Sequence, residues 1–288
     1  MWNTLLLTWC IKPKWKILSK KDDDLVFQKR LQQYNEAISY YIAKSDFHNI
    51  VFCDNSNFDF DVNWEMKKLA EKYNKFFEYI TYDWNKESNL YGYWYSECEI
   101  VDFAFENSQY IKKSKSWYKI TGRYILKDIN KLIHLTSQAD IYFHRQWIFD
   151  SPLTVSTSFF KISNSLYKEL LYKKHIGLYK ALEQKSYYKQ FFLNWSIPVE
   201  KIWYILLRVF LINHKKNINY SVPVYYIFPS SLPKKLNNPF WELIRKIIYF
   251  LYYLFWIDIL FSFHHRCYDV YYFKKIYKPL IKDKLIPW

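Results

Sequence analysis

The segment HNIVFCDNS, residues 48–56, decides the fold of this chain. Residues 49–53 form a short, mainly apolar run, which is typical of a buried strand, and the turn-forming sequence DNS follows at 54–56. Beyond the turn, apolar residues recur at helical spacing, at Met66, Leu69, Tyr73 and Phe76. A buried strand followed by an amphipathic helix predicts a βα unit.

The same pattern repeats on both sides of this unit. The sequence predicts strands at 4–11 (TLLLTWCI), 77–82 (FEYITY) and 117–126 (WYKITGRYIL), and helices at 26–44 and 96–107. Ser96 and Glu99 have the spacing of a capping box, which marks the start of the second helix. Strands that alternate with helices in this way predict the α/β class, with a mainly parallel sheet flanked by helices and a ligand site at the carboxyl ends of the strands.

The chain beyond residue 139 is predicted to contain further parts. Strands are expected at 139–147 and 155–163, and helices at 164–192 and 198–212. The Pro-, Ser- and Asn-rich stretch around 220–240 predicts a linker. We therefore expect an α/β domain at 1–163, a helical part at 164–219, and a linker with a basic, aromatic segment at 220–288.

The positive charge of the chain is unevenly distributed. The 288 residues carry a formal net charge of +15, and residues 164–288 contain 20 Lys and Arg but only 7 Asp and Glu. These cations are interleaved with Trp, Tyr and Phe, a mixture typical of surfaces that meet anionic lipid headgroups. A nucleotide bias towards codons for Lys, Asn, Ile and Tyr explains the same composition, so the sequence leaves both explanations open.

Residues 247–263 (IIYFLYYLFWIDILFSF) form the most apolar run, with Asp258 as its only charge. The run is shorter than the roughly 20 apolar residues that a spanning helix needs, and its Tyr and Trp side chains suit the interface. It predicts a helix that lies on a membrane. A helix buried against the rest of the protein would have the same length, and this alternative stays open.

The cysteines and the first residues bear on the compartment. Cys10, Cys53, Cys98 and Cys267 form no CxxC pair, so they indicate neither a zinc site nor a disulfide framework, which fits a reducing cytoplasm. The apolar run in residues 1–10 is short for a secretion signal and predicts a first strand instead. We expect a cytoplasmic protein, peripheral to the inner face of the cytoplasmic membrane.

Three carboxylates gather in the predicted helix at 96–107. Glu99 and Asp102 are three residues apart and share one side of a helix, whereas Glu97 lies partly around the turn. One explanation is that acidic side chains complement the helix dipole, which applies best to Glu99. The other is a catalytic role, for which Glu97 and Asp102 are the candidates.

The sequence KITGR, residues 119–123, places two cations around a glycine. Lys119 and Arg123 bracket Thr121 and Gly122 where a strand gives way to a turn, which is an arrangement suited to phosphate groups. If the strand is regular, Lys119, Thr121 and Arg123 point to the same face. A solvated face without a ligand is the alternative.

Several of these stretches together resemble a known family. The segments LLLTWCI (5–11), RLQQYNEAISYY (30–41), IVFCDNS (50–56), SECEIVDFA (96–104) and KITGR (119–123) look like those of bacterial capsule and lipopolysaccharide glycosyltransferases with a GT-A-like nucleotide-sugar domain. The resemblance covers roughly residues 1–210. It implies transfer of a sugar from a nucleotide donor to a glycan acceptor, which we expect to be lipid-linked.

The resemblance also implies roles for individual residues. Glu97 and Asp102 are the expected bases, which deprotonate the acceptor hydroxyl. The expected donor-binding residues are Thr8, Asp54, Asn55, Ser56, Gly92, Lys119, Thr121, Gly122 and Arg123. Asp54 to Ser56 would contact the nucleoside, and Lys119, Thr121 and Arg123 the diphosphate or the sugar.

The sequence leaves the cofactor open. Enzymes of this kind often hold Mg²⁺ or Mn²⁺ on a pair of aspartates, and no such pair follows the fourth predicted strand. Either Asp140 contributes one metal ligand, or Lys119 and Arg123 take the place of the metal. A different class of function is also open, namely a basic protein without enzymatic activity that binds nucleic acid or anionic membrane through its C-terminal half.

Overall fold

The computed structural model describes residues 3–11, 23–59, 63–83, 93–143 and 157–177, together with 179, 203, 206 and 226–227. All of these residues belong to one structural unit, formed by residues 1–146 and 153–227. Gly92, the stretch 247–263 and most of 180–225 lie outside the described residues. The predicted membrane-lying helix and the predicted division of the chain at residues 163 and 219 therefore stay predictions.

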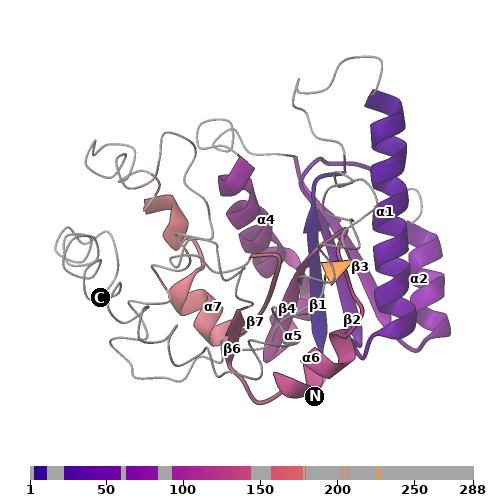
Figure 1. Ribbon diagram of the computed structural model, residues 1–288. Helices are drawn as coiled ribbons and strands as arrows, with labels where there is room; N and C mark the ends of the chain where they lie inside the picture. The colour runs from indigo at the N-terminus through magenta and orange to yellow at the C-terminus, as the bar shows by residue number, and fades with distance from the viewer. Residues whose placement is uncertain are drawn as a thin grey trace, which may run out of the picture. The chain divides into compact units, whose positions relative to one another are not determined.

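A six-stranded mixed sheet forms the centre of this unit (Figure 1), in the order β3-β2-β1-β4-β7-β6. Its strands are β1 (Thr4–Trp9), β2 (Asn49–Asp54), β3 (Phe76–Thr81), β4 (Ser116–Thr121), β6 (Ile141–Phe143) and β7 (Phe159–Ser163). The neighbours β3, β2, β1 and β4 are parallel, whereas β7 is antiparallel to both β4 and β6. The predicted α/β class with a mainly parallel sheet is confirmed.

Helices flank the sheet on both faces. They are α1 (Asp23–Lys44), α2 (Asn63–Lys72), α4 (Tyr93–Asn107), α5 (Gln109–Lys113), α6 (Ile129–Leu135) and α7 (Asn164–Leu170). The helices α1, α2 and α6 share one core with one face of the sheet. Helix α4 lies against the other face, where the carbonyl oxygen of its Ile100 is 3.7 Å from the Sγ atom of Cys53 on β2.

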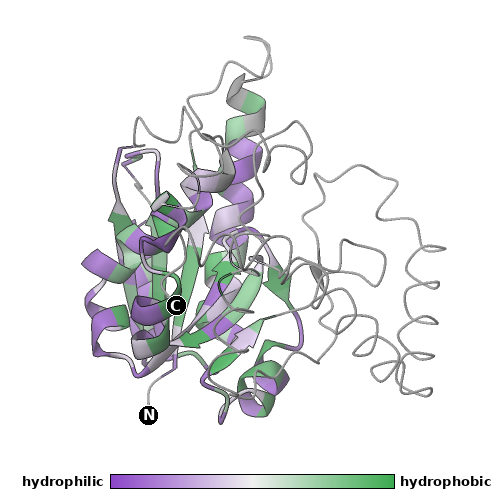
Figure 2. Cartoon of the chain, turned by 90° about the vertical axis from the view of Figure 1, so that its left-hand side faces the viewer, coloured by the Kyte–Doolittle hydropathy of each residue, from purple (hydrophilic) through white to green (hydrophobic). Residues whose placement is uncertain are grey.

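The alternation of side chains along β1 explains how both faces are covered. Leu5 and Leu7 point into the core beneath α1, and Leu6 points to the opposite face, where Thr8 reaches Glu97 of α4. All three leucines are completely buried. Figure 2 accordingly shows hydrophobic strands inside and hydrophilic stretches on the helices around them. A strand that is buried on both faces needs an apolar run rather than an alternating pattern, as the sequence of β1 shows.

Several predicted boundaries are wrong. Phe76, expected on a helix, begins β3, and the helix expected from residue 164 ends as α7 at Leu170. Helix α4 begins at Tyr93, so Ser96 lies within its first turns and does not cap it. The fourth predicted strand, 117–126, breaks after Thr121, because Gly122–Tyr124 form a turn and β5 (Ile125–Leu126) pairs separately with β8 (Tyr226–Ile227). The break redirects Arg123, as described below.

Within the part of the chain that the structure describes, no helix has the length and hydrophobicity needed to cross a bilayer.

Candidate functional site

The carboxyl ends of four parallel strands meet at one edge of the sheet. Thr8 of β1 is in register with Thr121 of β4, and Trp9 of β1 with Asp54 of β2. Asp54 is in turn in register with Thr81 of β3. The structure thus brings together residues from three separate segments of the predicted site, at the edge where α/β sheets bind ligands.

A buried ion pair lies on the α4 side of this edge. Lys119 of β4 is completely buried, and its Nζ atom pairs with Oε1 of Glu97. It also donates to the carbonyl oxygen of Thr157 at 2.6 Å and to Oγ1 of Thr121 at 3.3 Å. The hydroxyl of Thr8 donates to the same Oε1 of Glu97 at 3.4 Å. A lysine removed from water needs such partners, because its desolvation is otherwise very costly.

The Glu97 carboxylate is held at one oxygen and open at the other. Oε1 is engaged by Lys119 and Thr8, whereas Oε2 has no hydrogen-bond partner among the described residues. The side chain of Glu97 retains 21% of its exposure, so the carboxylate reaches the surface while its cation does not. The arrangement offers a positioned acceptor for a hydroxyl proton. Glu97 compensates the charge of Lys119, and the predicted contact of Lys119 with the donor stays a prediction.

Arg123 points to the opposite side of the edge. The expectation that Lys119, Thr121 and Arg123 share one face is wrong, since the strand ends before Arg123. The guanidinium lies 4.3 Å from the ring centre of Trp9, and its Nη1 donates to Oε1 of Gln33 on α1 at 3.3 Å. Burial lowers the pKa of this guanidinium from its ordinary value.

Gly122 permits the turn that redirects Arg123. Its N–H donates to the carbonyl oxygen of Thr8 at 3.0 Å. A Cβ atom at this position would lie 3.2 Å from that oxygen and 3.3 Å from Cε2 of Phe52. The close approach of β1 and the turn therefore favours glycine here.

The Asp54 carboxylate organises the loops around the edge. Oδ1 accepts from the backbone N–H of Ile11 at 2.7 Å, and Oδ2 accepts from the N–H of Ser56 at 3.0 Å and from Oγ1 of Thr81 at 3.1 Å. The Ser56 hydroxyl donates to both oxygens. Asp54 thereby ties the segments after β1 and β2 to the end of β3, and its contact with a nucleoside stays a prediction.

Two buried polar atoms beside Asp54 have no partner among the described residues. The amide oxygen of Asn55 and the indole Nε1 of Trp9 are both buried without a hydrogen bond, although the N–H of Asn55 donates to the carbonyl oxygen of Trp9 at 3.1 Å. Buried polar groups are nearly always satisfied in native proteins. Oδ1 of Asn55, just after β2, could accept a hydrogen bond from a ligand, and Nε1 of Trp9, at the end of β1, could donate one.

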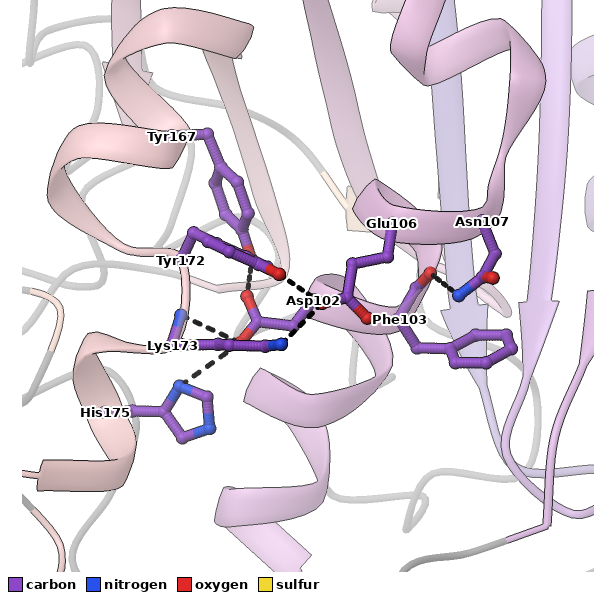
Figure 3. A network of polar contacts seen from close by, with 8 residues as sticks. All are labelled: Asp102, Phe103, Glu106, Asn107, Tyr167, Tyr172, Lys173 and His175. Atoms are coloured by element: carbon purple, nitrogen blue, oxygen red, sulfur yellow. Dashed lines mark hydrogen bonds and ion pairs between the residues drawn. The ribbon is translucent and has the colours of Figure 1, made fainter.

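Asp102 lies on α4 in a separate polar network (Figure 3). Its Oδ1 accepts from the Tyr167 hydroxyl at 2.6 Å and its Oδ2 from the backbone N–H of Lys173 at 3.0 Å, while Nδ1 of His175 lies 3.6 Å from Oδ2. The five-residue step from Glu97 to Asp102 turns their side chains about 140° apart on the helix. The structure therefore does not bring the two predicted bases together.

Burial is the main cause of the pKa shifts of Asp102 and His175. It raises the pKa of Asp102 to about 7 and lowers the pKa of His175 to about 3. Beside this pair, Glu106 accepts from the Tyr172 hydroxyl and pairs with Nζ of Lys173 at 2.6 Å. Lys173 has a positive φ of 57°, so the network fixes an unusual backbone conformation just after α7.

Asp140 does not join the other predicted residues. It precedes β6, whose direction follows that of β4, and its carbonyl oxygen accepts from the N–H of Ser163 at 2.8 Å. This places Asp140 at the amino-terminal edge of the sheet, opposite Glu97. Among the described side chains, no group of three or more His, Cys, Asp or Glu residues could hold a metal ion.

Sequence reasoning missed Trp9, Gln33 and Thr157. Trp9 follows Thr8 at the end of a predicted strand, so its position could have been noticed. Gln33 and Thr157 enter only through their contacts with Arg123 and Lys119, which no local pattern reveals.

No protein-family model and no curated protein matches the chain. Among solved structures, the chain is similar to the glycosyltransferase GlyE of Streptococcus pneumoniae TIGR4, at 9% identity and a TM-score of 0.44, over 76% of this chain and 45% of that one. The chain thus spans less than half the length of GlyE.

Two further solved structures are similar to the chain. One is a glycosyltransferase involved in the glycosylation of the major capsid of PBCV-1, at 8% identity and a TM-score of 0.38, over 76% of this chain and 82% of that one. The other is the nucleoside-diphosphate-sugar pyrophosphorylase from Vibrio cholerae RC9, at 10% identity and a TM-score of 0.36, over 78% and 95%.

Proposed function

We propose that this chain is a glycosyltransferase that moves a sugar from a nucleotide-sugar donor to an acceptor hydroxyl. The Glu97–Lys119 pair carries the proposal. It places a carboxylate with one fixed and one open oxygen at the carboxyl edge of a mainly parallel sheet, where ligands bind. The resemblance of residues 1–210 to GT-A-like transferases points to the same reaction.

The proposed chemistry is a displacement at the anomeric carbon. Oε2 of Glu97 accepts the proton of the acceptor hydroxyl as its oxygen attacks that carbon. The bond between the anomeric carbon and the donor's phosphate oxygen breaks, and the nucleoside diphosphate leaves with the electron pair. Lys119 and Thr8 keep Oε1 in place, so the carboxylate needs no reorganisation during the step.

The donor's nucleoside is proposed to lie at the end of β2. Trp9 and Asn55 offer an open donor and an open acceptor there, and Asp54 with Ser56 shapes the loop that carries Asn55. Thr121 and Gly122 border the same edge from β4. Gly92 keeps its proposed donor-binding role on the strength of the sequence resemblance.

The acceptor and the location are proposed from the sequence. A lipid-linked glycan of a bacterial capsule or lipopolysaccharide is the acceptor that the resemblance implies. The basic and aromatic residues of 164–288 and the apolar run at 247–263 support an enzyme that works at the inner face of the cytoplasmic membrane. Asp102, away from the edge, is proposed to support α4.

Donor binding and turnover provide the test. The full chain is screened by thermal shift against UDP-, GDP-, CMP- and dTDP-sugars, with and without Mg²⁺ or Mn²⁺. A ligand at about one hundred times its Kd adds about 2.7 kcal/mol to the free energy of unfolding, which a thermal shift resolves. Release of the nucleoside diphosphate from the donor that binds then reports turnover.

Glu97→Gln separates binding from chemistry. We expect this variant to bind the donor but to turn over about 10²- to 10⁴-fold more slowly, since general-base catalysis contributes that much. Glu71→Gln, which removes a carboxylate at an exposed position of α2, is expected to keep full turnover. If no nucleotide sugar binds to folded wild-type protein, the proposal falls and the basic binding protein becomes the better hypothesis.

A further inference from the structure

Two arginines lie where α1 meets the turn after β4. Arg30 is on α1, three residues before Gln33 and four before Tyr34, so it is about one helical turn from both. The Oε1 atom of Gln33 accepts from Nη1 of Arg123 at 3.3 Å, which brings Arg123 to the same part of α1. Burial raises the pKa of Tyr34, and the charges of Arg123 and Arg30 oppose this rise. Among the described residues, neither guanidinium forms an ion pair.

The surroundings of Arg123 hold it without neutralising it. Trp9 covers one face of the guanidinium at 4.3 Å, and the amide oxygen of Gln33 accepts from Nη1. The buried Nε atom has no partner in the described part of the chain. Asp54, whose charge also acts on Tyr34, has its oxygens engaged by neutral backbone and hydroxyl donors.

This arrangement is costly in the free protein. Burial lowers the pKa of Arg123, and the charge of Arg30 lowers it further. An anion that binds between Arg30 and Arg123 would reduce both their mutual repulsion and the cost of their desolvation. Planar guanidinium groups match the oxygens of phosphate with paired hydrogen bonds.

We propose that Arg30 and Arg123 together form a binding site for a diphosphate group on the α1 side of the sheet edge. The inference rests on the proposed function in naming the donor as the source of that group. The two predicted cations then have different functions. Lys119 forms an ion pair with Glu97, and Arg123 binds the phosphate groups. The proposed site also assigns a role to Arg30, in the segment 30–41 that carries part of the family resemblance.

Calorimetric titration of the full chain tests the site directly. The probes are inorganic diphosphate and UDP, each at about 50 and about 200 mM salt. We expect Arg30→Gln and Arg123→Gln to weaken diphosphate binding about 10- to 100-fold each, which corresponds to the loss of charge-assisted hydrogen bonds. Arg123→Lys keeps the charge but loses the planar fork, so its loss should be smaller.

Lys29→Gln is the matched control. It removes the same charge from the adjacent residue of α1, at an exposed position, and should leave the Kd within about twofold, as expected for a screened surface charge. Circular dichroism melts establish that each variant is folded. Because Arg30 is only half-buried, Arg30→Gln tests the site even if substitution of Arg123 perturbs the turn.

The outcomes separate this inference from the proposed function. If both arginine variants bind diphosphate as tightly as the wild type and the wild type turns over a donor, the arginine site is wrong and the proposed transferase function is supported. Arginine-dependent diphosphate binding without turnover of any donor supports the site and overturns the transferase. Tighter binding of UDP than of inorganic diphosphate identifies a nucleotide as the source. Absence of diphosphate and UDP binding by the wild type overturns the inference.

Discussion

At the residue scale, the predicted site residues differ in the contacts that they make within the protein. Lys119 and Asp54 are both charged residues of predicted strands or of the turns that follow them. In the structure, Lys119 pairs with one catalytic candidate, and Asp54 joins the segments after β1 and β2 to the end of β3. Of the two predicted cations at the site, Arg123 is the one without a counter-charge among the described residues.

Gly122→Ala tests the close approach at the end of β4. The added methyl would meet a backbone oxygen at 3.2 Å and an aromatic carbon at 3.3 Å, so we expect the free energy of unfolding to fall by about 1–3 kcal/mol. Gly177→Ala is the matched control, because nothing lies within 4 Å of the place that an added methyl would take there. Urea denaturation measures both, and equal stabilities would contradict the close approach.

Asp54→Ala tests the loop clamp. Removal of the carboxylate leaves the N–H groups of Ile11 and Ser56 without their acceptor, which costs about 1–3 kcal/mol for each unsatisfied group. We expect the variant to lose stability even without any donor. Asp59→Ala, at an exposed position of the following loop, should be nearly neutral. A stable Asp54→Ala protein that fails only in donor binding would assign this carboxylate to the ligand instead.

At the element scale, α4 links the sheet edge to the segment after α7. One side carries Glu97, and another carries Asp102 and Glu106, which hold Tyr167, Tyr172 and the left-handed Lys173. A rigid helix with polar anchors on two sides can fix the position of a catalytic carboxylate. We therefore propose that Asp102 positions α4, and with it Glu97.

The titration of Asp102 predicts a pH-dependent effect of Asp102→Asn. The pKa of Asp102 is raised by burial from 3.8 to about 7 in the folded state, so the native protein binds the extra proton between these values. Stability from this group accordingly falls as pH rises through that window. The asparagine side chain cannot ionise, so the variant does not lose stability in this way. The free energy of unfolding of Asp102→Asn, relative to that of the wild type, should therefore rise between about pH 4 and about pH 7.

For Glu106→Gln we expect the opposite pH dependence of the free energy of unfolding. Burial alone would raise the pKa of Glu106, but its hydrogen bonds with Lys173 and Tyr172 outweigh burial and lower it. Its contribution to stability is present above the ordinary pKa and is lost as pH falls. Urea denaturation at several pH values measures both variants, and parallel pH profiles would contradict the assignment.

At the scale of the whole molecule, the charge is concentrated in one part of the chain. Residues 164–288 hold most of the net charge of +15, whereas the sheet and its site lie mainly in the nearly balanced first part. Such an asymmetry suits a protein whose catalytic unit is brought to a negatively charged surface.

Vesicle binding by the full chain tests this prediction. We expect cosedimentation with vesicles that contain anionic phosphatidylglycerol and little with neutral phosphatidylcholine vesicles. Each basic residue near the surface contributes about 1 kcal/mol, and salt screens this attraction. Binding should therefore weaken between about 0.1 and about 1 M salt. Equal binding to both kinds of vesicle would contradict an electrostatic mechanism.

The sequence by itself determined the α/β class, the parallel strands and the edge at which the candidate site lies. These follow from local patterns, because a buried strand requires an apolar run and a flanking helix requires apolar residues at helical spacing. It also brought forward Glu97, Lys119 and Arg123 as candidates. Only the tertiary structure decided how these candidates are arranged, since the pairing of Lys119 with Glu97, the turn at Gly122 and the meeting of Arg123 with Trp9 and Gln33 join segments distant in the chain. Long-range contacts of this kind depend on how the sheet and helices pack, which no local pattern encodes.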